Sequence, residues 1–195
     1  ADLLRSFTGI SKDVRRHKEE VKGACEALLP LMVQKAMTAP PRMDQMVFMP
    51  LHMPPYLSER VFAELWWPTF KQMVEELVQE DYYLYIFFEG DWTRYYDYLQ
   101  ELPKGRILGR FEYADPVVIK EKLGKIMSVT GFFPITLLAQ GSKEACIDKT
   151  KELMDILAPG GGYVFGFDKI ATSVRDVKME NITAVNEYVR LNGKY

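Results

Sequence analysis

Five short apolar runs, each followed by a stretch of helical character, constrain the fold of this chain more than any other feature. The runs are almost continuously apolar, which is typical of strands in a parallel sheet whose two faces are both covered. Strands that alternate with helices predict an α/β fold with a predominantly parallel sheet. The predicted strands are Met46–Leu51, Tyr82–Phe88, Arg106–Phe111, Ile126–Thr130 and Tyr163–Phe167.

Capping residues and prolines set the bounds of the predicted helices. Ser58 begins a helix that runs to Gln79, and Pro68 is expected to kink or interrupt it. Asp115 is placed to cap another helix, because the following proline is tolerated in a first turn. The pattern leaves open whether the sheet is doubly wound or part of a barrel. The predicted helices cover 12–37, 58–79, 93–102, the segment from 115 onward, 141–157 and 180–191.

Length and charge exclude several classes of protein. A chain of 195 residues with 48% hydrophobic residues is long enough for one domain with a real core, and we expect residues 1–195 to form it. The 25 basic and 27 acidic residues give a net charge of -2, which does not favour a nucleic-acid partner. No apolar run reaches the ~20 residues that span a bilayer. We therefore expect a cytoplasmic protein without a membrane partner.

Five segments are informative through their order along the chain: His52–Ser58, Glu89–Trp92, Asp115–Gly124, Thr130–Pro134 and Leu157–Asp168. In that order they resemble the C-terminal half of the uroporphyrinogen decarboxylase superfamily. That superfamily includes cobalamin-dependent methyltransferases. A glycine-rich turn joins a predicted helix to the last strand, and polar residues follow earlier strands. No segment is specific alone, but the ordered set covers nearly the whole chain.

The resemblance implies a partial (β/α)8 TIM barrel. Five strands do not close such a barrel, which needs eight strands of consistent tilt and shear. The chain is therefore a fragment, a polypeptide that pairs with another chain, or a sheet with an unusual cap, and the sequence leaves these alternatives open. We expect self-association or association with the missing barrel half.

In a barrel of this type the residues at the carboxyl ends of the strands face the active site. We predict His52 and Glu89 as catalytic residues, each able to donate a proton. A structural role remains open for both: a backbone hydrogen bond for His52 and an ion pair with Arg94 for Glu89. The four groups His52, Glu89, Asp91 and Glu112 are expected to converge, so that at least one carboxyl group has a raised pKa.

Four further residues are predicted to bind substrate: Asp91, Trp92, Glu112 and Asp168. Trp92 is suited to the wall of a pocket for an aromatic or quaternary-ammonium donor, and packing beneath its loop is the alternative. Glu112 can equally be a surface carboxylate.

The resemblance implies transfer of a methyl group from a small donor to a corrinoid held by a partner protein. Thiol-activating members carry zinc on a histidine and two cysteines, whereas the matching positions here are Phe87, Glu89 and Gly161. We therefore predict no metal site, and no cofactor bound by the chain itself. Porphyrinogen decarboxylation fits less well, because the loop 167–169 lacks the family's histidine. The alternative to methyl transfer is a catalytically silent truncated barrel that acts as an interaction module or subunit.

Overall fold

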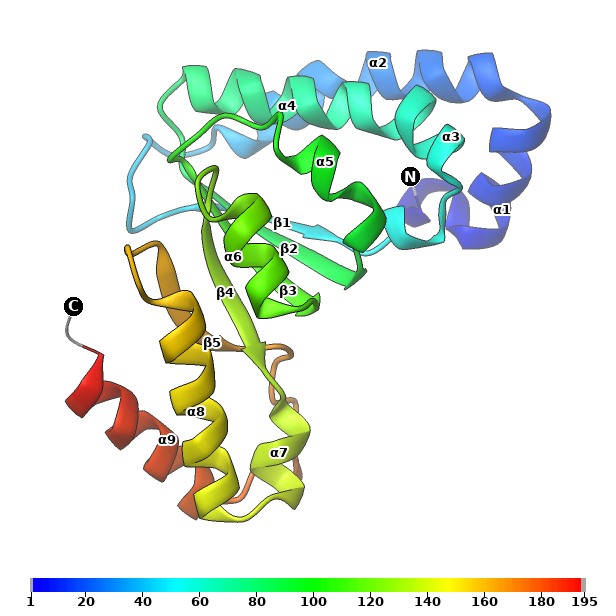
Figure 1. Cartoon of the computed structure of the whole chain (residues 1–195). Coiled ribbons are helices and arrows are strands. Elements are labelled where there is room, and N and C mark those ends of the chain that lie inside the picture. The colour runs from blue at the N-terminus through cyan, green and yellow to red at the C-terminus, as the bar shows by residue number, and fades with distance from the viewer. Residues whose placement is uncertain (1, 194–195) are drawn as a thin grey trace.

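The predicted parallel sheet is present. The computed structural model describes residues 2–193, with side chains from residue 4 onward; residues 1 and 194–195 of the predicted domain lie outside the described part. All five strands are parallel and stand side by side in their order along the chain (Figure 1). They are β1 (Val47–Leu51), β2 (Leu84–Asp91), β3 (Ile107–Tyr113), β4 (Ser128–Phe133) and β5 (Tyr163–Phe167).

Helices connect successive strands and flank the sheet at both ends of the chain. The longer elements are α1 (Asp2–Arg16), α2 (Lys18–Ala36), α4 (Trp67–Gln79), α6 (Pro116–Leu123), α8 (Lys143–Leu157) and α9 (Met179–Asn192). Short ones lie between them: η1 (Pro54–Tyr56), α3 (Glu59–Val61), the π-turn η2 (Phe62–Trp66), η3 (Thr93–Tyr95), α5 (Tyr96–Leu99), α7 (Ile135–Gln140) and η4 (Val174–Asp176). No helix in the described range 2–193 is long and apolar enough to cross a membrane.

The expectation that both faces of the sheet are covered is wrong. Sequential parallel strands joined by right-handed crossovers place every connecting helix on the same face, as in a barrel. Along β2 the side chains of Leu84, Ile86 and Phe88 are fully buried, whereas those between them are only half-buried. On the opposite face, which we call the open face, Phe48 is 52% exposed and Val164 is 51% exposed.

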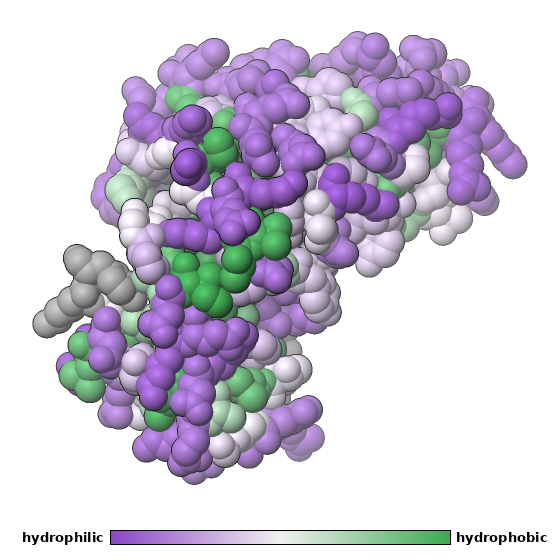
Figure 2. All heavy atoms as spheres, in the orientation of Figure 1, coloured by the Kyte–Doolittle hydropathy of each residue, from purple (hydrophilic) through white to green (hydrophobic). Residues whose placement is uncertain are grey.

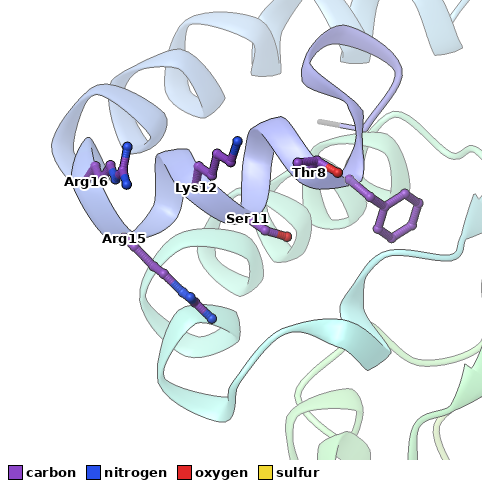
Figure 3. Close-up of a pocket in the computed structure, with 6 residues that line it drawn as sticks. Thr8, Ser11, Lys12, Arg15 and Arg16 are labelled. Atoms are coloured by element: carbon purple, nitrogen blue, oxygen red, sulfur yellow. The ribbon is translucent and has the colours of Figure 1, made fainter.

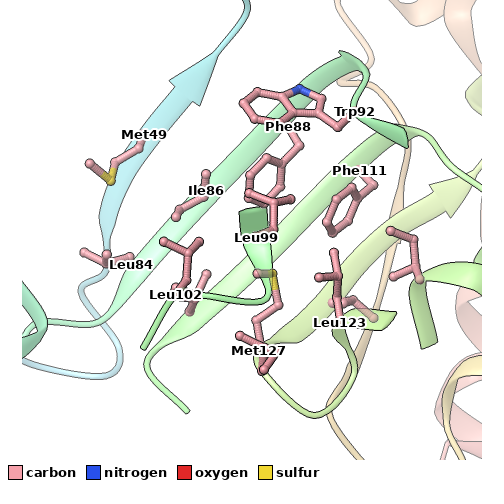
Figure 4. Packing of buried hydrophobic residues seen from close by; sticks show 14 of the residues in the cluster. Met49, Leu84, Ile86, Phe88, Trp92, Leu99, Leu102, Phe111, Leu123 and Met127 are labelled. Atoms are coloured by element: carbon pink, nitrogen blue, oxygen red, sulfur yellow. The ribbon is translucent and has the colours of Figure 1, made fainter. Parts of the chain in front are cut away.

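The core lies between the sheet and its helices. Phe88 stacks on Phe111 with ring centroids 4.7 Å apart, and Trp92 packs edge-on against Phe88 at 4.9 Å. Leu99 and Leu123 close this layer from α5 and α6 (Figure 4). On the helical side, Figure 2 shows mostly hydrophilic surface with an apolar patch over α6.

Two helix boundaries follow from local chemistry. Pro68 has no amide hydrogen to donate into the preceding turn, and the helix begun at Ser58 passes through the π-turn η2 just before it. The predicted helix 12–37 is two helices, α1 and α2, which meet at His17. The prediction missed α7 and most of α1.

Candidate functional site

The carboxyl ends of β1, β2 and β3 bring three of the predicted residues to one edge of the sheet. Leu51 is paired with Phe88, so His52, directly after β1, and Glu89, near the end of β2, lie at the same end of the sheet. Phe88 is paired in turn with Phe111, which brings Glu112 to that end as well. Because side chains alternate along a strand, Glu89 and Glu112 lie on the face opposite these phenylalanines, which is the open face.

Glu112 is held in a fixed position by two contacts. One carboxylate oxygen accepts a hydrogen bond of 2.8 Å from the backbone amide of Gly90 on β2. The other forms a 2.8 Å ion pair with Lys169, which lies in the loop after β5. Lys169 Nζ also donates to the hydroxyl of Tyr113 at 3.1 Å. The pKa of Lys169 is raised, first because of the hydrogen bond to Glu112 and then because of Tyr113.

Asp168 and Asp91 use their carboxylates to fix the backbone locally. Asp168 Oδ1 accepts hydrogen bonds from the amides of Ile135 at 2.8 Å and Lys169 at 2.7 Å, and so ties the end of β5 to the start of α7. Asp91 Oδ1 accepts one from the amide of Thr93 at 2.9 Å. Hydrogen bonds from the Thr93 side chain and backbone lower the pKa of Asp91, so Asp91 is not the carboxyl group with a raised pKa that was expected among the four residues.

Trp92 lies away from the open face. Its side chain is 0% exposed among the aromatic residues of the helical side, and its Nε1 donates to the carbonyl of Glu89 at 3.0 Å. This position agrees with the alternative that Trp92 packs beneath its loop. It does not agree with a place in the wall of a pocket on the open face. His52 is half-buried beside α1, with its ring centroid 6.3 Å from that of Phe7.

Glu89 differs from these residues because no residue in the described range 4–193 forms a hydrogen bond or ion pair with its carboxylate. The pairing considered with Arg94 is not present, since that guanidinium donates to the carbonyl of Pro55 and lies over the ring of Tyr95. Glu89 is half-buried at the open end of β2. A carboxyl group in this position is accessible to a ligand and is not consumed by the fold.

A hollow of about 460 Å³ lies on the open face between β2 and β5. The loop after β5 contributes to its wall. Sequence analysis missed its central residue, Arg110, although an arginine within an otherwise apolar run was a usable signal. The lining residues are Tyr85, Arg110, Thr130, Phe165, Gly166, Phe167, Lys169, Ile170 and Ala171.

A second hollow, of about 430 Å³, lies along α1 and away from the strand ends. Its lining includes Lys12, Arg15 and Arg16, whose side chains project from that helix (Figure 3). Within the described part of the chain, no three His, Cys, Asp or Glu side chains are placed to hold a metal ion together.

The fold and the position of the site define a class of protein: a parallel sheet with helices on one face and polar residues at the carboxyl ends of its strands. A sequence model of the family described as Uroporphyrinogen decarboxylase (URO-D) matches residues 3–191. The chain therefore belongs to the uroporphyrinogen decarboxylase superfamily. No individual curated protein matches it.

Proposed function

We propose that this chain is a methyltransferase-like member of the superfamily, which moves a methyl group from a small donor to a corrinoid carried by a partner protein. The observation that supports the proposal best is the Glu89 carboxyl at the open end of β2, which has no partner among the described residues. Glu89 lies two residues along the strand from Phe87, whose strand partner Arg110 lines a hollow of small-molecule size. The small donor would bind in the hollow, and the corrinoid would be the methyl acceptor.

Glu89 would supply the proton that the reaction needs. Cobalt(I) supplies the electron pair for the new cobalt–carbon bond, and the donor heteroatom keeps the pair of the bond that breaks. An ether oxygen would leave as an alkoxide, so it requires a proton to leave as a neutral alcohol, whereas a quaternary ammonium donor leaves as a neutral amine without one. Glu112 cannot readily do the same, because Gly90 and Lys169 bind both of its oxygens. Lys169 holds Glu112 at the rim of the site, and Asp168 positions the loop that carries Lys169.

The test is a methyl-transfer assay with the full chain. Purified protein is incubated with reduced cob(I)alamin and a panel of methyl ethers, methylamines and quaternary ammonium compounds, and methylcobalamin is followed by absorbance. The proposal predicts chain-dependent methylcobalamin formation with at least one donor class. Rates equal to the protein-free reaction for every class, with free cobalamin and with an added corrinoid protein, would contradict it.

A silent interaction module is the second candidate. The observation that favours it is that three of the predicted site carboxylates, Asp91, Glu112 and Asp168, already serve the fold through local contacts. A module of this kind needs the open face only as a binding surface. It predicts no methyl transfer above the protein-free rate, for the unaltered chain and for Glu89→Gln alike, whereas the catalytic proposal predicts activity that Glu89→Gln largely removes.

A further inference from the structure

We infer that Arg110 forms the binding site for a carboxylate group on the small molecule that this protein takes. The side chain projects from the middle of β3 on the open face, and it lines the hollow between β2 and β5. The inference rests on the proposed function, since it names the chemical class of the donor.

The Nε atom of Arg110 is buried without a hydrogen-bond partner among the described residues. Arg110 is only 8% exposed, its Nε is inaccessible to solvent, and no residue in the described range 4–193 accepts a hydrogen bond from it. A buried charged group without a partner is costly, so natural proteins rarely keep one. A ligand with two acceptor oxygens would satisfy the guanidinium, whose planar donor fork matches a carboxylate.

Neighbouring residues hold Arg110 in place without neutralising it. Its Cζ lies 4.7 Å from the ring centroid of Phe87, which supports the guanidinium through a cation–π contact. The other cation of the hollow, Lys169, is already paired with Glu112 at 2.8 Å. Arg110 is therefore the unpaired positive charge of this hollow within the described part of the chain.

The rest of the hollow suits a small carboxylate with an apolar body. Thr130, which is paired in register with Arg110, offers a hydroxyl, whereas Tyr85 offers ring surface. Gly166 keeps space open here, because a Cβ at this position would lie 2.5 Å from Thr130 Oγ1. The lining thus combines one cation without an anionic partner, Arg110, with apolar side chains.

The position of Arg110 relative to Glu89 fits a bound substrate. Phe87 is paired with Arg110, and Glu89 lies two residues further along β2 on the same face. Two residues of a strand span about 7 Å. A molecule whose carboxylate contacts Arg110 would therefore place its far end, one small ring or chain away, beside the Glu89 carboxyl.

Calorimetric titration of the full chain with benzoate and benzamide tests the inference. These two probes share shape, but only benzoate carries the carboxylate. We expect benzoate to bind at least about tenfold more tightly than benzamide, as one charge-assisted hydrogen bond allows. Arg110→Met should abolish this preference, and Arg110→Lys should retain part of it. Arg190→Met removes an exposed arginine from α9 and should leave the preference unchanged.

Circular dichroism establishes that each variant folds. Absence of benzoate binding to the folded chain, or equal preference in Arg110→Met and the unaltered protein, would overturn the inference. Tighter binding of phenylphosphonate than of benzoate would also overturn it, in favour of a phosphoryl ligand. If the chain binds benzoate through Arg110 but transfers no methyl group, only the proposed function is contradicted. If the chain transfers a methyl group at a rate that does not depend on Arg110, only this inference is contradicted.

Discussion

Glu89 and Glu112 lie near the carboxyl ends of the neighbouring strands β2 and β3, yet their surroundings give them different roles. Glu112 is bound by Gly90 and Lys169, so its carboxylate is fixed and its charge is balanced. Glu89 has neither kind of contact with the described residues. The strand-end rule predicted the position of both side chains, but the partner of Glu112 comes from a loop that is distant in sequence. Contacts of this kind could not be read from the chain.

Glu89→Gln should reduce methyl transfer by about a hundredfold or more, because the amide keeps the shape of the side chain but cannot donate the required proton. Folding should be nearly unchanged, since the carboxylate contributes no contact to the described structure. Steady-state kinetics and urea unfolding measure the two effects. Glu121→Gln, an exposed change on α6, serves as the control and should have no effect. Full activity of Glu89→Gln would refute the catalytic role.

Asp91 should stabilise the protein more at neutral pH than in acid. Its pKa is lowered in the folded state, so the folded chain favours the ionised form. The stabilisation is therefore present above the unfolded pKa of about 3.9 and is lost as the pH falls through the folded value. Asp91→Asn should lower the free energy of unfolding at pH 7, and the difference should vanish near pH 2. A difference independent of pH in urea titrations would disprove this linkage.

At the scale of the elements, periodic and capped segments were predictable and short or interrupted ones were not. The strand β5 has the predicted bounds, and α6 begins after Asp115, whose carboxylate accepts a hydrogen bond from Val117 at 2.8 Å. The short helix α7 was missed because it follows Pro134 directly and has no side-chain cap. The open face carries apolar residues such as Phe48, although they are exposed. The strand sequences are therefore apolar on both faces, and this pattern led to the wrong prediction that both faces are covered.

Glycine substitutions in two elements should have opposite effects on stability. Gly23 lies exposed inside α2, and a Cβ there would meet no atom within 4 Å. Gly23→Ala should therefore raise the free energy of unfolding by about 0.5–1 kcal/mol. At Gly109 in β3 a Cβ would lie 2.7 Å from Met127 Sδ, so Gly109→Ala should cost about 1–3 kcal/mol through overpacking. Denaturant unfolding of both variants checks the contrast, which fails if the two shifts share a sign.

At the scale of the whole molecule, the open face is the feature that most needs explanation. The resemblance predicted part of a barrel, and the sequential parallel sheet agrees with it. Among the described residues, β1 and β5 each pair with a single neighbouring strand, so the sheet ends in two unpaired edges. In a closed barrel the open face would be the interior. Sequence alone could not show how much apolar surface this arrangement leaves uncovered.

We expect a second copy of the chain to cover the open face of this half-barrel in solution, and sedimentation velocity of the purified chain measures this association. We predict self-association that grows with concentration, with species heavier than the 22.6 kDa of one chain. Phe48→Lys should shift the distribution toward single chains, because it places a charge on the open face. Val117→Lys, at a residue 45% exposed on the helical side, should not. A single 22.6 kDa species at every concentration would contradict the account.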